Sequence, residues 1–414
     1  MIRILDQRAA HELLERKAAR LDQAEKVVAP IIGAVRTGGD AALLEYCRKL
    51  DGFTGTSIAV PCEDCQSALG ELDAEFLSAI ELATRNIREC AQAQLPKECF
   101  VQYADGRRLG QIVRPLDSMG AYIPGGRYPL PSTLLMTVIP AQVAGVRNIA
   151  IVCPQPSVEI LGVAAYLNVS CLYHMGGAHA IAALAYGTET VPKVDRIVGP
   201  GNIYVAAAKK LIAGETGIDF IAGPTEIVII AAEGNAVHLA ADMLAQAEHD
   251  VDASAILLTT SRSLAKEVAA EIERQLASLS TAAVAGEAIA RNSAIVLFEQ
   301  IEQAVEFANE LAPEHLALHD PSLLPAIRHA GSIFLGASSP EAAGDYASGP
   351  NHVLPTGGAA RLRGGLSSAD FVKLVSVQEL SDCALQGLAP AITTLARAEG
   401  LEAHARSVEV RLHG

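Results

Sequence analysis

Four short stretches, far apart along the chain, offer side chains suited to binding a metal ion and to proton transfer. They are QAEH at 246–249, APEHL at 312–316, GDY at 344–346 and the C-terminal residues 399–404. None contains cysteine, and each offers oxygen or imidazole nitrogen. Structural zinc usually recruits thiolates, so a metal held only by nitrogen and oxygen ligands indicates a catalytic site.

Gln246 and His249 are three residues apart in a predicted helix, so both side chains project from one face. Helical ligands at this spacing are a known way to hold a metal. Taken alone, the pair is more typical of a surface or capping role than of a metal site, and Asp345 and His404 are individually no more specific. The prediction of a metal site therefore depends on the four stretches together.

Glu314 and His315 are candidates for acid–base chemistry. A neutral histidine with a reference pKa of ~6.5 is a competent general base near neutrality, and the adjacent glutamate adds a second base for a separate proton. Adjacent residues on a strand face opposite ways, so both can serve one site only where the backbone turns. Pro313 is compatible with such a turn. A helix-to-strand loop with solvated charges remains the alternative.

Several glycine-rich turns could hold a cofactor, although the chain contains neither GxGxxG nor a Walker sequence. They are YIPGG at 122–126, GGA at 176–178, GPGN at 199–202 and GPTE at 223–226. The second and third are expected to open helices, whose free N–H groups suit a phosphate. The residues alone leave open whether these turns form a dinucleotide pocket or only connect strands to helices.

The elements that must position these residues alternate between strand and helix. From 122 to 225 we expect strands at 148–153, 172–175, 195–198 and 219–221, and helices at 132–144, 178–186 and 203–212. A second set places strands at 227–231, 255–259, 294–298, 316–318 and 332–335, with helices at 236–248, 263–278 and 301–311. This pattern predicts parallel α/β sheets with short connections.

The remaining segments are expected to be simpler. Residues 1–50 and the stretch to about 97 read as helical, and 99–119 alternate as strands do. Residues 343–365 are rich in Gly, Pro, Ser and Asn, which predicts a long ordered loop or lid. The tail from Ser367 is expected to be helical.

Composition narrows the class of protein. The chain has 414 residues, 50% hydrophobic and 4% aromatic, which predicts at least two domains of α/β type. Its formal net charge of −15 and the absence of a Lys/Arg-rich stripe argue against nucleic-acid binding. The N-terminus is not a secretory signal, and no run approaches the ~18–20 apolar residues of a membrane span. The eight cysteines show no disulfide spacing, the lone CxxC at 62–65 included, so we expect free thiols and a soluble, cytoplasmic protein.

Taken together, these motifs resemble those of the histidinol dehydrogenase family over essentially the whole chain. The resemblance is carried by 122–126, 176–187, 199–202, 245–249 and 312–316, and above all by AGDYASGPNHVLPT at 343–356. It implies two incomplete Rossmann-like parallel α/β domains with helical N-terminal and C-terminal segments. The activity implied is NAD-dependent, four-electron oxidation of L-histidinol through L-histidinal to L-histidine, the last steps of histidine biosynthesis.

The resemblance also implies residue roles. Gln246, His249, Asp345 and His404 would bind one zinc ion per active site, in a homodimer where His404 reaches the partner's site. Thr225, Glu399, His315 and the metal ligands would hold the substrate, and Tyr122, His179 and Asn202 would lie along NAD. His315 would take the hydroxyl proton before each hydride transfer, and Glu314 would activate water to attack the bound aldehyde.

The implied division of the chain has four parts. It comprises an N-terminal helical segment at 1–23, a discontinuous zinc-binding catalytic α/β domain at 24–120 and 226–366, an NAD-binding Rossmann-like domain at 121–225, and a C-terminal helical dimerisation segment at 367–414.

The sequence departs from the family pattern in places, and other functions stay open. His179 stands where glutamine is usual, Thr225 stands where serine is common, and 153–171 is shorter than usual. A paralogue oxidising another small polar alcohol, such as a sulfonated diol, would share these motifs. A zinc hydrolase that uses Glu314 to activate water is the alternative from another class.

Overall fold

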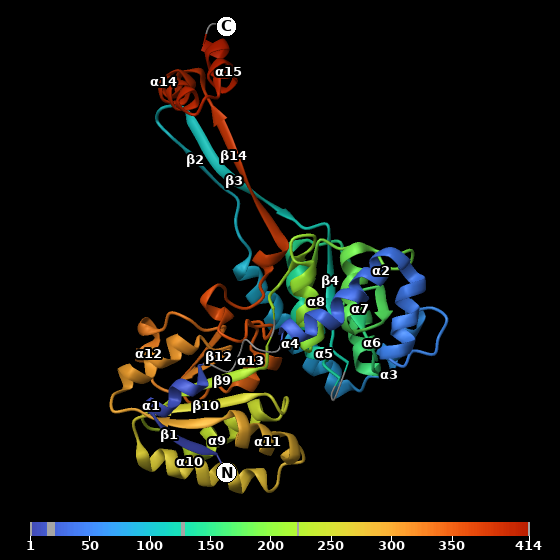
Figure 1. Cartoon of the computed structure of the whole chain (residues 1–414), viewed down its shortest axis with the longest axis vertical. Helices are drawn as coiled ribbons and strands as arrows, with labels where there is room; N and C mark the ends of the chain where they lie inside the picture. Colours follow the sequence, from blue (N-terminus) through green and yellow to red (C-terminus); the bar gives the residue numbers. More distant parts are fainter. Residues whose placement is uncertain (1, 15–20, 126–128, 222, 413–414) are drawn as a thin grey trace.

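Two parallel β-sheets covered by helices form the body of the molecule, and a three-stranded antiparallel sheet extends from it (Figure 1). The computed structural model describes residues 2–14, 21–125, 129–221 and 223–412, so Gly126 of the YIPGG motif lies outside the described residues. The predicted α/β class with Rossmann-like parallel sheets is confirmed.

The first parallel sheet has the strand order β6-β5-β4-β7-β8. Its central strands are buried and apolar on both faces, as a parallel sheet between helical layers requires. The last strand comes earlier than expected, because the carboxylate of Asp219 turns inward to accept hydrogen bonds from Gly199 N and Lys209 Nζ. The strands are β4 (Ser118–Tyr122), β5 (Asn148–Cys153), β6 (Cys171–His174), β7 (Arg196–Val198) and β8 (Gly217–Ile218).

Helices between these strands cover the first sheet, three of them as predicted and a fourth, at 158–166, in addition, and helices from the N-terminal quarter cover it as well. The former are α5 (Pro131–Ala144), α6 (Val158–Tyr166), α7 (Gly177–Tyr186) and α8 (Ile203–Ile212). The latter are α2 (Leu21–Leu50), α3 (Cys62–Glu71) and α4 (Ala74–Gln94). Helix α2 packs on α7 and α8, α3 on α6, and α4 on α5. Residues 21–94 therefore pack on helices of the sheet formed by 118–218.

Helix α2 qualifies the expectation about membrane spans. Among the described residues, one helix, α2, is long enough and apolar enough to cross a membrane by length and composition alone. In the structure, Val28, Val35 and Leu43 of its apolar stripe are buried in a core cluster shared with the alanine-rich helix α7. A core helix of a soluble protein passes the same test.

The second parallel sheet has the strand order β1-β11-β10-β9-β12-β13. Strand β1 pairs with β11 at the edge, which corrects the expectation that residues 1–50 are helical throughout. The strands are β1 (Arg3–Asp6), β9 (Glu226–Ile230), β10 (Ser254–Thr259), β11 (Ala294–Leu297), β12 (His315–Leu318) and β13 (Ser332–Leu335). Its helices include α1 (Gln7–Ala10), α9 (Ala236–Ala247), α10 (Arg262–Leu276), α11 (Ala282–Asn292) and α12 (Ile301–Leu311).

A long arm leaves the body and carries the last two helices to its far end (Figure 1). It consists of β2 (Cys99–Gln102), β3 (Arg107–Pro115) and β14 (Val372–Leu380), followed by α14 (Asp382–Ala398) and α15 (Glu402–Leu412). The expectation of a wholly helical tail missed β14, which pairs with β3 along its whole length. Because its partner strand lies more than 250 residues earlier in the chain, the sequence of the tail alone contains no pattern that identifies β14.

The segment at 343–365 begins inside a short helix, α13 (Glu341–Tyr346), rather than as loop. It then runs between the two halves of the body. Asn351 Nδ2 donates to the carbonyl of Met136 in α5 at 2.6 Å, while Gly357 N donates to Glu226 Oε1 at 3.1 Å. The segment thus connects the helical layer of the first sheet to the amino-terminal edge of the second.

Candidate active site and metal centre

The Glu314–His315 pair lies where the chain turns sharply into β12. Helix α12 ends at Ala312, whose φ of 49° is in the left-handed region, and Pro313 follows. The backbone turns where adjacent side chains would need it to turn in order to reach one site, and both side chains are buried, Glu314 at 6% and His315 at 4% exposure. His315 pairs with Ile227 of β9, so Glu314 lies beside Glu226 at the amino-terminal edge of the sheet.

Two donors hold the Glu314 carboxyl group. Thr225 Oγ1 donates to its Oε2 at 2.5 Å, and the backbone N–H of Glu226 donates to the same oxygen at 3.0 Å. Burial raises the pKa of Glu314 to about 8, although these hydrogen bonds act in the opposite direction. The group therefore carries its proton over much of the neutral range and becomes a base as that proton leaves.

The hydrogen bonding of His315 favours one of its neutral tautomers. Its Nδ1 lies 3.3 Å from the carbonyl oxygen of Glu226, which can only accept, so the proton belongs on Nδ1. The other nitrogen, Nε2, is buried, has no hydrogen-bond partner among the described residues and lies 3.8 Å from Asp345 Oδ1. Burial lowers the pKa of His315 to about 4, while the charge of Asp345 opposes that shift. The site therefore presents an unprotonated nitrogen to its interior.

The candidate metal ligands come from two elements beside this pair. Gln246 is fully buried in the last turn of α9, and His249 follows the helix and is exposed. Asp345 lies on α13, with its Oδ2 3.8 Å from His249 Nε2. The structure thus brings together three of the four ligands predicted from the sequence.

Sequence reasoning missed one further carboxyl group, that of Glu341. Ligand atoms of His249, Glu341 and Asp345 all lie within 4.8 Å of one another. Glu341 is 2% exposed, and its burial, followed by the charges of Asp345 and Glu314, raises its pKa well above the usual value. An acid in a first helical turn is common, so its type alone was uninformative. Its spacing of four from Asp345, on one helical face, could have identified it.

The donor set fits a divalent metal ion. With its nitrogen donating to Thr225 Oγ1 at 2.6 Å, Gln246 turns its amide oxygen toward the carboxyl group of Glu341. Two acceptors that face each other need a shared cation or proton. With the amide turned over, the nitrogen donates to Glu341 Oε2 at 3.0 Å, and no shared cation or proton is required between the two groups. Both orientations leave amide and carboxylate oxygens beside an imidazole nitrogen, and ligands of these types suit zinc.

Glu399 and His404 do not join this cluster within one chain. Glu399 caps the end of α14 and His404 lies in α15, both exposed at the far end of the arm (Figure 1). The body that holds the other ligands lies at the opposite end of the arm strands.

Tyr122, His179 and Asn202 all lie at the carboxyl-terminal edge of the first sheet, after β4, β6 and β7. The glycine turns at 176–178 and 199–202 open helices α7 and α8, as predicted. The hydroxyl of Tyr122 accepts a hydrogen bond from Gly177 N at 3.1 Å. The side-chain oxygen of Asn202 accepts from the N–H groups of Tyr204 and Val205, which caps α8. This edge is where open α/β sheets bind ligands.

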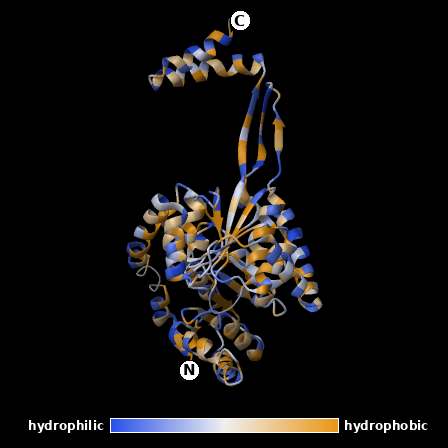
Figure 2. Ribbon diagram, turned by 90° about the vertical axis from the view of Figure 1, so that its right-hand side faces the viewer, coloured by the Kyte–Doolittle hydropathy of each residue, from blue (hydrophilic) through white to orange (hydrophobic). Residues whose placement is uncertain are grey.

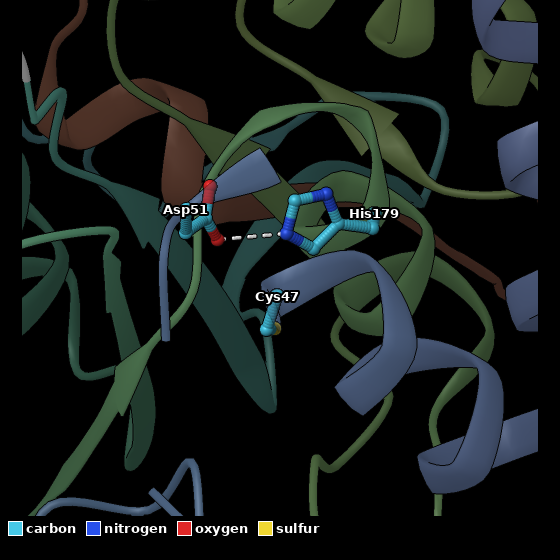
Figure 3. Close-up of side chains that lie close together, drawn as sticks. All are labelled: Cys47, Asp51 and His179. Atoms are coloured by element: carbon cyan, nitrogen blue, oxygen red, sulfur yellow. Dashed lines mark hydrogen bonds and ion pairs between the residues drawn. The ribbon is translucent and has the colours of Figure 1, made fainter. Parts of the chain in front are cut away.

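His179 does not face solvent but pairs with Asp51, which follows α2 (Figure 3). Its Nε2 lies 2.8 Å from Asp51 Oδ2, and Gly176 N donates to the same oxygen at 2.9 Å. Cys47 lies beside them, with ligand atoms of the three residues within 4.8 Å. Burial raises the pKa of Cys47 to about 12, so the thiol stays protonated, and the carboxylate and imidazole already satisfy each other. The Asp51 carboxylate thereby anchors the turn that opens α7.

Comparison with known proteins gives one consistent family. The family model described as histidinol dehydrogenase matches residues 14–412. A histidinol dehydrogenase of Halalkalibacterium halodurans is 48% identical over 400 residues, covering 94% of each chain. One of Geobacillus kaustophilus is 49% identical over 401 residues, with the same coverage. The crystal structure of histidinol dehydrogenase from Elizabethkingia anophelis superposes with a TM-score of 0.94 at 36% identity, covering 100% of this chain and 98% of that one.

Proposed function

This chain belongs to the histidinol dehydrogenase family and is an oxidoreductase acting on a CH–OH group, and we propose that it converts L-histidinol through L-histidinal to L-histidine with two NAD⁺ and one zinc ion per subunit. The observation that carries the proposal is the unpartnered Nε2 of His315, which points toward Asp345 in the candidate metal site. A free base beside a substrate-orienting metal is what alcohol oxidation requires.

Gln246, His249 and Asp345 would hold the zinc ion together with His404 from a second subunit. Zinc would act mainly as a template that binds and orients the nitrogen atoms of the substrate. Thr225 and Glu399 would bind the substrate as well.

In the first oxidation, His315 Nε2 takes the proton of the substrate hydroxyl while the adjacent carbon gives a hydride to NAD⁺. Asp345, whose charge raises the pKa of His315 against the effect of burial, stabilises the imidazolium formed. Positioned bases of this kind typically contribute ~10²–10⁴-fold to the rate.

In the second oxidation, deprotonated Glu314 takes a proton from water as the water oxygen attacks the aldehyde carbon. His315, again neutral, takes a proton from the resulting diol while the carbon gives a hydride to the second NAD⁺. The sum is one alcohol, one water and two NAD⁺ converted to one carboxylate, two NADH and three protons. Keeping the aldehyde in the site avoids a second encounter and protects a reactive intermediate.

NAD would bind at the carboxyl-terminal edge of the first sheet, in the domain assigned to 121–225. Helices α7 and α8 begin there, and the positive ends of their dipoles suit the phosphates. Tyr122 and Asn202 support those helix starts, and the buried Nδ1 of His179, which lacks a partner among the described residues, is available to a cofactor atom.

A homodimer would complete the active site. Hydrophobic residues along the arm are orange in the ribbon of Figure 2, and large apolar side chains on the strands and helices of the arm are exposed, more than a solvated surface needs. They are Phe100, Val101, Leu374, Val375, Leu380, Leu395, Leu401 and Val410. If the arm of one subunit packed against the body of a second subunit, these side chains would be buried. Glu399 and His404 would then lie at the partner's metal site.

The cytoplasm is the compartment that best suits the enzyme. All eight cysteines are free, including the CxxC pair at 62–65 in α3. Free thiols fit a reducing compartment, where amino-acid biosynthesis also takes place.

The test is the yield of NADH at 340 nm with limiting L-histidinol and excess NAD⁺, before and after zinc removal and return. We expect two equivalents per histidinol, abolished by a chelator and restored by zinc. Full yield without metal would contradict the zinc site, and no yield from a metal-loaded dimer would favour a paralogue with another alcohol substrate. Ester or amide hydrolysis without NAD would favour the hydrolase.

A further inference from the structure

The Glu341 carboxyl group is buried at the centre of the site, yet neither base nor ligand roles account for it. It begins α13 and lies one helical turn before Asp345. Side chains four apart share a helical face, so one short helix presents both carboxyl groups to α9 and β12.

Glu341 contacts two groups that the proposed reaction uses. Its Oε1 lies 3.3 Å from Nδ1 of His315, and its Oε2 lies 3.0 Å from the amide of Gln246. One side chain therefore links the base to a metal ligand.

The first contact matters because His315 has little else to hold its ring. Nδ1 has the carbonyl of Glu226 at 3.3 Å, a long hydrogen bond, and Nε2 has no partner. Without a second acceptor at Nδ1, the ring could rotate or the proton could move to Nε2. In either case an N–H group would occupy the position where the unprotonated nitrogen must act as base. Partners of this kind around metal sites typically change activity or metal affinity by ~10–100-fold.

We propose that Glu341 is a positioning residue that accepts the Nδ1–H of His315 and holds the Gln246 amide, so that base and metal ligand are oriented together. This inference rests on the proposed role of His315. It assigns Glu341 neither proton transfer nor metal ligation.

The test compares zinc-loaded Glu341→Ala and Glu341→Gln with wild type, with Glu302→Gln on the exposed face of α12 as control. Histidine tautomers are read from ¹⁵N-imidazole NMR, with the His315 resonances assigned by their loss in His315→Gln. Zinc content and kcat for both half-reactions are measured in parallel, with and without formate, which can fill the space left in Glu341→Ala.

We expect wild type and Glu341→Gln to show a single Nδ1–H tautomer, because an amide oxygen still accepts. Glu341→Ala should show mixed tautomers, ~10–100-fold lower kcat with nearly unchanged KM, and partial rescue by formate but not by chloride. Glu302→Gln should behave as wild type. Wild-type kcat in Glu341→Ala, equal impairment of both variants, or zinc loss as large as in Gln246→Ala would overturn the proposal. Failure of wild type to oxidise histidinol would instead reject the proposed function, since the tautomer readout needs no turnover.

Discussion

The hydroxyl of Thr225 donates to Oε2 of Glu314 across 2.5 Å, at the adjoining ends of two neighbouring strands. The backbone N–H of Glu226 donates to the same oxygen. Both of these hydrogen bonds go to Oε2, and neither reaches Oε1. In the proposed reaction this carboxyl group would activate water for the second oxidation.

Glu314→Gln should therefore separate the two oxidations. Glutamine keeps the shape and can accept from Thr225, but it cannot take a proton from water. We expect oxidation of histidinal to slow by ~10²–10⁴-fold, and oxidation of histidinol by less than tenfold. Stopped-flow NADH formation with each substrate measures both, and equal losses would refute the division of roles.

The same hydrogen bond predicts a matched pair at Thr225. Thr225→Ser retains the hydroxyl and should keep near wild-type rates. Thr225→Val is similar in volume but removes the hydroxyl, which leaves the buried carboxyl group with only the Glu226 N–H as donor and the Gln246 nitrogen without its acceptor, at a cost of ~1–3 kcal/mol. We expect histidinal oxidation to fall ~10–100-fold in Thr225→Val only, measured in the same assay. Equal rates in both variants would show that the bond is not used.

The position of His404 predicts complementation between inactive subunits. His404→Asn and Gln246→Ala should each lower zinc content and abolish activity. In dimers re-formed from an equal mixture, heterodimers would contain one site with both defects and one intact site. About 25% of wild-type activity should return if subunits exchange freely. No recovery despite proven exchange, followed by mass spectrometry, would mean that sites are not shared.

The Asp51–His179 pair predicts an effect on cofactor affinity alone. Asp51→Ala leaves Gly176 N and the imidazole unpaired at the turn that opens α7. We expect NAD⁺ affinity, measured by calorimetry, to fall about tenfold, with zinc content unchanged. His179→Gln can still donate to Asp51 and should bind within a few-fold of wild type. Unchanged NAD⁺ affinity in Asp51→Ala would show that this turn does not contribute to cofactor binding.

Asp242, one turn before Gln246 in α9, predicts a dependence of stability on pH. Burial raises its pKa from 3.8 to about 6. The folded state thus binds more protons than the unfolded state between those values, so its contribution to stability falls as pH rises through that window and is constant above it. Asp242→Asn should be more stable at pH 7 by about 1 kcal/mol, discounted for partial exposure, with a gap that narrows toward pH 4. Thermal unfolding of both proteins at several pH values measures the gap, with Glu302→Gln as control; a gap that widens toward acid would contradict the shift.

Local pattern was sufficient for most elements of the two sheets. Strands β5, β9, β10 and β11 and helices α9 and α10 lie within a few residues of their predicted positions, because apolar runs and glycine turns mark where such elements begin and end. Helices α6 and α11 were not predicted. Strands β1 and β14 were missed, since each is defined by a partner nearly 300 or more than 250 residues away. A four-residue edge strand and a half-exposed arm strand lack the apolar run that identifies a buried one.

The sequence by itself determined the family and the types of side chain available to the chemistry, because motifs such as that at 343–356 are long enough to be specific. Only the tertiary structure decided which of them meet. Glu314 and Thr225 are joined by the register of two parallel strands, and Glu341 enters the site because α13 folds onto α9. The structure also separates Glu399 and His404 from the other ligands within one chain (Figure 1). Distances of this kind follow from long-range packing, which no local window of sequence encodes.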